Sequence, residues 1–234
     1  MQDMTVVSRD EWTKARLALL EEEKRFTRTR DALSEMRRKL PAVKVEKDYR
    51  FETENGTVTL VDLFADKSQL IIQHFMYGTD WEEGCPSCSF WADGYNGFAI
   101  HIGQRDAALM TVSKAPLEKL LAYKRRMGWT FPWVSSENSS FNEDFQVSFT
   151  PDMIDSGDAV YNYRTKSFPS TEAPGISVFV RNDAGKIFHT YSTYSRGLDM
   201  MNAAYHYLDL LPKGRDEDAL DYPMAWVKRH DKYE

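Results

Sequence analysis

Cys85 and Cys88 are the only two cysteines of the chain and stand in the sequence Cys-Pro-Ser-Cys. A short, nearly continuous apolar run, Leu70 to Phe75, precedes them and predicts a buried strand. Residues 87–97 follow without a proline and predict a helix. Two cysteines with this spacing, between a strand and a helix, are typical of a redox-active dithiol rather than of half a zinc site.

The position of Cys85 at the start of the predicted helix indicates its chemical role. The unpaired backbone N–H groups and the positive dipole end of a helix N-terminus favour a thiolate. Pro86 suits the first helical position, because its missing N–H costs no hydrogen bond there. Cys88 lies one turn deeper. We therefore expect Cys85 to attack a disulfide and Cys88 to resolve the mixed disulfide.

Two other interpretations of the cysteine pair remain open: a metal site and two inert buried thiols. A closed zinc site needs four ligands, whereas the chain has no further cysteines and its five histidines show no paired spacing. We therefore expect no metal and no cofactor. Asp80, Glu82 and Glu83 precede Cys85, and negative charge disfavours a thiolate. We expect these carboxylates to be solvated in a loop.

Composition limits the class of protein. The 234 residues suit one large domain with extensions, and an apolar content of 42% is ample for a core. The net charge of −6 argues against nucleic acid as the main partner. The first residues show no basic segment followed by an apolar one, and no apolar run reaches transmembrane length. We therefore expect a cytoplasmic protein without a membrane partner.

A long N-terminal helix is predicted from Ser8 to Leu40. Ser8 and Glu11 have the spacing of a capping box, and Pro41 stops the helix. Four of its apolar side chains recur every seven residues and form a thin stripe: Trp12, Leu19, Phe26 and Leu33. We favour packing of this narrow face on the protein's own domain. The alternative is a contact between two copies along the stripe.

The remaining pattern predicts a mixed α/β domain over residues 43–212, between a helical extension (1–42) and a charged C-terminal tail (213–234). The predicted elements are a hairpin at Asn55-Gly56, a strand at Ala107–Val112, a helix at Pro116–Met127, a strand at Phe131–Ser135, a hairpin at Gly175–Tyr194 and a closing helix at Leu198–Leu210. Residues 150–173 form an irregular segment that contains Tyr161, Tyr163 and Arg164. Long loops of this kind are usually functional or disordered.

This order of elements resembles the thioredoxin-like fold in its larger, peroxiredoxin-type version. Several long strings of residues are similar to the DUF899 family of thioredoxin-like proteins: EKDYRF (Glu46–Phe51), DWEEGCPSCSFWAD (Asp80–Asp93), RMGWTFPWVSS (Arg126–Ser136), YNYRT (Tyr161–Thr165), FHTYSTYSRGLD (Phe188–Asp199) and YHYLDLLPKGRDE (Tyr205–Glu217). The resemblance covers about residues 11–217. It implies a central mixed sheet flanked by helices and a thiol–disulfide oxidoreductase role.

Two details follow from the resemblance. Thioredoxin-like folds place a cis-proline just before the late hairpin and facing the cysteines, which corresponds to Pro174 here. The segment Tyr77–Pro86 resembles the peroxidatic loop of peroxiredoxins, with Asp80 and Trp81 at its acidic and aromatic positions. The threonine of that loop is Glu82 in this chain, its proline is Gly78, and the later arginine has no match around Ile176. These departures argue against peroxidase chemistry.

We therefore expect a thiol–disulfide oxidoreductase that acts on a disulfide-containing protein or a small thiol, with a homodimer as an additional expectation. The expected substrate groove consists of Pro174, Trp81, Pro86, Tyr161, Tyr163 and Arg164. A thiol peroxidase that uses Cys85 is the rival within the same chemistry. A non-catalytic or metal-binding thioredoxin-like module is the rival from another class.

Overall fold

The computed structural model describes residues 4–165 and 168–234. In these residues a central sheet of eight strands has the order β1-β10-β9-β4-β5-β6-β2-β3, and a separate sheet pairs β7 with β8. The strands are β1 (Val43–Lys44), β2 (Arg50–Thr53), β3 (Gly56–Thr59), β4 (Gln69–His74), β5 (Ala107–Ser113), β6 (Trp133–Ser135), β7 (Val160–Tyr161), β8 (Arg164–Thr165), β9 (Gly175–Arg181) and β10 (Ile187–Tyr194).

The strand order confirms the predicted thioredoxin-like arrangement. β4 and β5 run parallel and are joined by helices, while β9 pairs antiparallel with β4 on its other side. β10 then pairs antiparallel with β9 as the second strand of a hairpin. Parallel neighbours need a crossover connection, and the segment with the two cysteines forms the start of that crossover. β4 is therefore the central strand from which the cysteine loop leaves.

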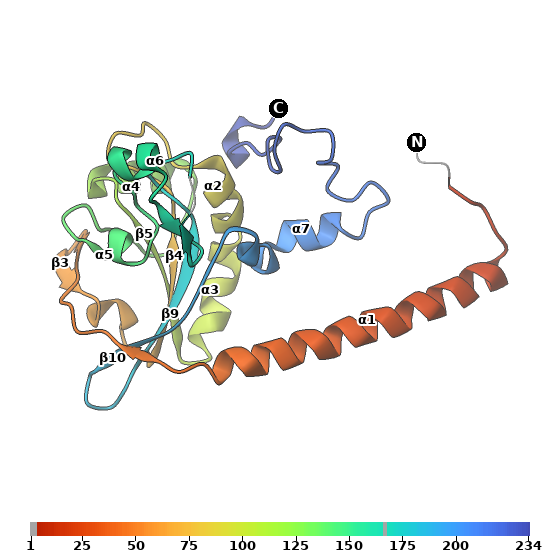
Figure 1. The fold of residues 1–234 in the computed structure, drawn as a ribbon, viewed down its shortest axis with the longest axis horizontal. Coiled ribbons are helices and arrows are strands. Elements are labelled where there is room, and N and C mark those ends of the chain that lie inside the picture. Colours follow the sequence, from red (N-terminus) through yellow and green to blue (C-terminus); the bar gives the residue numbers. More distant parts are fainter. Residues whose placement is uncertain (1–3, 166–167) are drawn as a thin grey trace.

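The helices are α1 (Arg9–Arg38), α2 (Pro86–Ala92), α3 (Tyr95–Gly103), α4 (Leu117–Arg126), α5 (Phe141–Asp144), α6 (Pro151–Ser156) and α7 (Ala203–Leu208), with shorter 3₁₀ turns η1 (Asp62–Phe64), η2 (Ser195–Met201) and η3 (His230–Lys232). Of these, α2, α3 and α4 pack on one core cluster of the sheet, and η1 and α5 pack on the other, whereas α1 projects away from the sheet (Figure 1). The predicted closing helix is thus divided into η2 and α7. Asn202 divides it because its side chain accepts from the Tyr205 N–H and caps α7.

Side chains of β4 alternate between two cores, as the pleat of a strand requires. Ile71 and Phe75, the residue after β4, face an aromatic-rich cluster under α2, α3 and α4. Leu70 and Ile72 face a second cluster formed with η1, α5 and the β2–β3 hairpin. The cysteine loop therefore starts from a strand end that is fixed on both faces.

Helix α1 begins with the predicted capping box, in which the Ser8 side chain accepts from the Glu11 N–H and the Glu11 side chain accepts from the Ser8 N–H. Every residue of α1 is described and none is buried. Figure 1 shows the helix projecting away from the sheet. The expectation that its apolar stripe packs on the protein's own domain is therefore wrong. Seven-residue spacing indicates an apolar face but does not say what covers it. Contact between two copies remains a proposal.

We expect Phe26→Ala to change the free energy of unfolding of the isolated chain by less than about 0.5 kcal/mol, as for a surface residue. Phe26 is 67% exposed, whereas Phe51 is 0% exposed. The matched change Phe51→Ala should cost about 3–5 kcal/mol. Denaturant unfolding at several protein concentrations measures both. A loss above 2 kcal/mol (about four times the surface expectation) for Phe26→Ala in a monomeric sample would contradict the exposed position of α1.

Candidate active site

Cys85 and Cys88 lie at the N-terminus of α2, where the sequence placed them. Cys85 is the N-cap residue, Pro86 occupies the first turn, and the Cys85 Sγ accepts from the Cys88 backbone N–H at 3.5 Å. Both thiols are free. Cys85 is partly exposed, while Cys88 is only 3% exposed. Cys85 is therefore the more accessible of the two thiols.

The backbone of one residue, Met76, holds both cysteines against the end of β4. The Met76 N–H donates to the Cys88 Sγ at 3.4 Å, and the Met76 carbonyl accepts from the Cys85 N–H at 3.0 Å. Gly84 allows the cysteine loop to lie close to the Phe75 and Tyr123 rings, since a Cβ at this position would lie 2.8 Å from the Phe75 ring and 3.0 Å from the Tyr123 ring. The loop is thus anchored by its backbone and closely packed from below.

The pKa values of the two thiols are shifted in opposite directions. The hydrogen bond from the Cys88 thiol lowers the pKa of Cys85 to about 7, with help from the backbone N–H groups of Cys88 and Ser87 and from the charge of Arg229, against the opposing effect of burial. Burial raises the pKa of Cys88, and the hydrogen bond to Cys85 and the Cys85 charge raise it further. The first proton lost from the pair therefore leaves a thiolate at Cys85.

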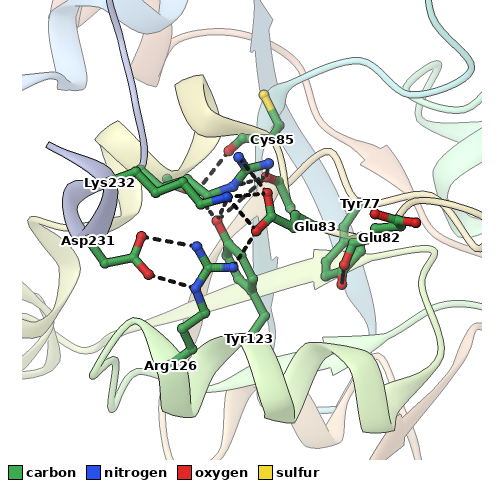
Figure 2. A network of polar contacts seen from close by, with 11 residues as sticks. Tyr77, Glu82, Glu83, Cys85, Tyr123, Arg126, Asp231 and Lys232 are labelled. Carbon is green, nitrogen blue, oxygen red and sulfur yellow. Dashed lines mark hydrogen bonds and ion pairs between the residues drawn. The ribbon is translucent and has the colours of Figure 1, made fainter.

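Glu83 corrects one expectation from the sequence. Its carboxylate is not a solvated loop group, because it pairs with Arg126 at 2.5 Å, Arg229 at 2.8 Å and Lys232 at 2.9 Å. Figure 2 shows this network beside the cysteine loop, with Asp231 bound to Arg126 on its outer side. The hydrogen bonds from Lys232 and Arg126 lower the pKa of Glu83. The negative charge near Cys85 is therefore neutralised.

Asp80 and Glu82 are exposed, as expected for loop carboxylates. Arg229, Arg126 and Lys232 were not predicted as site residues. Arg229 and Lys232 come from the C-terminal segment, which the sequence indicated only as a charged tail. No local pattern in that tail indicates which loop it contacts.

A cavity of about 200 Å³ opens beside Cys88. Most of its surface is apolar, and its walls come from the end of β4, from α2, from the start of β9 and from η2. Trp91, Pro174, Ile176 and Leu198 line it, together with Gln73. Gln73 is buried, and its side-chain oxygen has no partner among the described residues. The cavity can take a small apolar group next to the second thiol.

Pro174 lies in this cavity, but the prediction of a cis bond is wrong. No peptide bond within residues 4–165 and 168–234 is cis. The trans chain is held on both sides of the proline. The Ala173 N–H donates to the Val147 carbonyl at 2.8 Å, and Gly175 pairs with His74 as β9 begins. The approach of Pro174 to the site thus needs no unusual isomer.

The other expected groove residues lie at different distances from the cysteines. Trp81 packs against the aromatic cluster below the loop. The Tyr161 hydroxyl donates to the Pro174 carbonyl at 2.8 Å. Tyr161 therefore fixes the backbone of a residue that lines the cavity. Tyr163 donates to the Ser192 carbonyl at 3.0 Å, and Arg164 is exposed in the β7–β8 pair. Neither of these two residues lines the cavity beside Cys88.

Glu172 is a buried carboxyl group that the sequence did not reveal. Its two oxygens accept from the Ser148 hydroxyl at 2.9 and 2.8 Å. Burial raises the pKa of Glu172 to about 7, although hydrogen bonds from Ser148 and Asn142 act in the opposite direction. The charge of Glu172 in turn raises the pKa of Cys88. Its protonation is therefore coupled to the second thiol.

In the parts of the chain that the structure describes, no group of three or more His, Cys, Asp or Glu side chains is placed to hold a metal ion. Within the same residues, no helix has the length and apolar character needed to cross a bilayer.

We expect iodoacetamide to label Cys85 with a pH midpoint near 7, since only the thiolate reacts and burial opposes ionisation of Cys88. Cys88 should react at least about tenfold more slowly at neutral pH. Mass spectrometry of the two peptides after timed labelling measures both rates. Faster labelling of Cys88 would reverse the two assigned roles.

Glu172→Gln should change how stability depends on pH. The pKa of Glu172 is 4.5 in the reference state and about 7 in the folded chain. Between these values the folded state binds more protons, so the contribution of Glu172 to stability is complete below pH 4.5 and is lost as the pH rises through 7. Relative to the glutamine variant, the unmodified chain should lose about 1–3 kcal/mol over that interval. Parallel denaturant curves at all pH values would contradict the raised pKa.

Comparisons with known proteins identify the family of the chain. The family model described as "Bacterial protein of unknown function (DUF899)" matches residues 1–233. Among curated proteins, none matches the chain.

Three solved structures illustrate distant likeness. Xanthomonas campestris peroxiredoxin Q is 15% identical with a TM-score of 0.46, covering 69% of this chain and 89% of its own. Peroxidoxin BcpB from Mycobacterium tuberculosis is 16% identical with a TM-score of 0.45, covering 70% and 94%. A candidate thiol-disulfide oxidoreductase from Bacteroides vulgatus is 14% identical with a TM-score of 0.40, covering 71% and 97%. At these values the fold assignment rests on the strand order of the chain itself.

Proposed function

The chain belongs to the DUF899 family, and we propose that it is a thiol–disulfide oxidoreductase in which Cys85 attacks and Cys88 resolves. The observation that carries this proposal is the pair itself: a partly exposed thiol with a pKa of about 7 at a helix N-terminus, and a buried thiol one turn deeper. A nucleophile with a pKa near the ambient pH is the most effective attacking thiol.

The reaction has two exchange steps. The Cys85 thiolate attacks one sulfur of a target disulfide, a Cys85–target S–S bond forms, and the other target sulfur leaves as a thiolate that takes up a proton. Cys88 then loses its proton and attacks the Cys85 sulfur, and the target leaves as a second thiol. The target gains two electrons, and Cys85 and Cys88 become joined in a disulfide.

The contacts of the two thiols support an explanation of why Cys88 reacts only after Cys85 has formed the mixed disulfide. The negative charge of Cys85 is one of the causes that raise the pKa of Cys88. In the mixed disulfide Cys85 is neutral, so this cause disappears when Cys88 must react. Burial continues to oppose ionisation of Cys88, which suits a thiol that should attack only the adjacent mixed disulfide.

The cavity beside Cys88 supports a target with an apolar group next to its disulfide. Its lining of Trp91, Pro174 and Leu198 is apolar and lies beside the second thiol. We therefore propose a disulfide-containing protein or a small thiol compound as the partner. We propose the cytoplasm as the compartment, because reducing conditions there keep a catalytic pair in its reduced form.

A thiol peroxidase is the second candidate, and the acidity of the partly exposed Cys85 is the observation that favours it. A peroxide would oxidise the Cys85 thiolate to a sulfenic acid, and Cys88 would condense with it, releasing water and forming the same disulfide. A metal-binding module is less favoured, since two thiols supply only half of a closed zinc site.

We expect Cys85→Ser to abolish reduction of insulin disulfides, because the attacking thiolate is lost. Cys88→Ser should keep the first step and accumulate a covalent mixed disulfide, because no thiol remains to resolve it. Ser87→Ala, between the two cysteines, is the matched control and should retain activity. Reduction of insulin and consumption of hydrogen peroxide, measured in parallel with dithiothreitol as reductant, give the readout.

Peroxide consumption without reduction of insulin disulfides would favour the peroxidase. Full insulin reduction by Cys88→Ser would contradict the resolving role. If neither activity depended on Cys85, the oxidoreductase proposal would be wrong.

A further inference from the structure

The C-terminal segment returns to the cysteine loop and packs on the helix that follows it. Val227 is buried, the Trp226 ring lies 5.5 Å from the Phe90 ring of α2, and His230 contacts Asp93 at the end of α2 at 2.6 Å. Asp231 pairs with Arg126 of α4 at 2.6 Å. Residues 226–232 therefore form a strap across α2 and α4, next to the loop that precedes Cys85.

Arg229 makes the central contact of this strap. Its Nε and Nη2 both donate to the Gly84 carbonyl, at 3.0 and 2.7 Å, and its Nε also contacts the Tyr123 hydroxyl at 3.0 Å. Its Nη1 pairs with Glu83 at 2.8 Å, and the Arg229 side chain is only 16% exposed. Two nitrogens thus converge on the carbonyl immediately before Cys85.

The Gly84 carbonyl belongs to the same peptide unit as the Cys85 N–H. That N–H donates to the Met76 carbonyl, and the Met76 N–H donates to the Cys88 sulfur. The guanidinium is therefore the outer end of a hydrogen-bonded series that passes through the Gly84–Cys85 peptide to the Met76 carbonyl, while the N–H of the preceding Phe75–Met76 peptide bonds separately to Cys88. Hydrogen bonds in such a series polarise one another.

We propose that Arg229 is a positioning residue for Cys85, which fixes the Gly84–Cys85 peptide and places a positive charge beside the thiolate. The catalytic meaning of this role rests on the proposed oxidoreductase function. An arginine that only anchored the C-terminus would need the ion pair with Glu83 and not the bidentate contact with Gly84. The planar fork of arginine directs two nitrogens at the Gly84 carbonyl and a third at Glu83 in one fixed geometry, which the single nitrogen of lysine does not reproduce.

The ion-pair network beside the loop carries one more positive charge than negative. Arg126, Arg229 and Lys232 stand against Glu83 and Asp231, which is three cations against two anions. The other charged groups near the loop are its own exposed carboxylates, Asp80 and Glu82, Lys119 on the Thr79 and Trp81 carbonyls, and the His230–Asp93 pair. Four buried tyrosines also face the loop or the pair, Tyr77, Tyr95, Tyr123 and Tyr161, and burial raises the pKa of each, so they stay neutral near pH 7. Glu172 acts on Cys88. Among the charged side chains around the loop, Arg229 is the one whose charge lowers the pKa of Cys85.

The test is the pH profile of Cys85 alkylation in the full chain with Arg229→Gln, Arg229→Lys and the matched control Lys228→Gln. Lys228 is the adjacent residue and is exposed, so its replacement removes the same charge from the same strap. We expect Arg229→Gln to move the midpoint upward by about half a pH unit or more, which slows labelling about threefold below the midpoint. Arg229→Lys should show a smaller change in the same direction, about twofold in rate. Lys228→Gln should keep the unmodified profile.

Identical profiles for Arg229→Gln and Lys228→Gln would overturn the proposal. Labelling of Cys88 in the same experiment reports whether the fold around the pair persists. Equally fast labelling of both cysteines in Arg229→Gln would mean that the fold around the pair is lost in that variant. The pH profile of Arg229→Lys is then the test, and a profile equal to that of the unmodified chain would overturn the proposal. Alkylation needs no disulfide substrate, so an inactive protein in the insulin assay would contradict the proposed function without affecting this result.

Discussion

The backbone of Met76 is the feature on which the arrangement of the site depends. Met76 follows the central strand β4, and its two backbone polar groups bond to the two cysteines, the N–H to the Cys88 sulfur and the carbonyl to the Cys85 N–H. Because β4 is fixed by β5 and β9 on its two edges and by a core on each face, this backbone cannot shift without disturbing the sheet. The relative positions of the thiols therefore follow from the stability of the sheet.

The difference in acidity between the thiols follows from that geometry. The same short α2 exposes the first thiol to N–H groups and buries the second in apolar surroundings. Hydrogen bonding and burial then act on the two pKa values in opposite directions. A guanidinium, Arg229, acts on Cys85, and a carboxyl group, Glu172, acts on Cys88. The chain thus adjusts each thiol separately.

The two ends of the chain behave differently. The N-terminal helix α1 leaves its whole apolar stripe exposed (Figure 1), whereas the charged C-terminal segment folds back and becomes part of the wall around the cysteine loop (Figure 2). Composition alone favours the opposite outcome, since the helix has a regular apolar stripe and the tail is mostly polar. Long-range ion pairs and one buried residue, Val227, are enough to hold the tail in place.

Features that depend only on neighbouring residues could be predicted from the sequence. The cysteine spacing, Pro86 after Cys85, the Ser8–Glu11 capping box and the Asn55-Gly56 turn each act within a few residues, so their signals survive without knowledge of the fold. The order of strands and helices followed from periodicity, and the resemblance to a known family supplied the arrangement of the sheet. The contact of Arg229 with a carbonyl 145 residues earlier in the chain became visible only in the folded structure. The same is true of the paired Glu83, the buried Glu172, the trans Pro174 and the uncovered helix α1. These features depend on which distant segments of the chain contact each other. Apolar periodicity indicates that a helix face can be buried, and a local charge indicates that a side chain can form an ion pair, but neither identifies the partner segment.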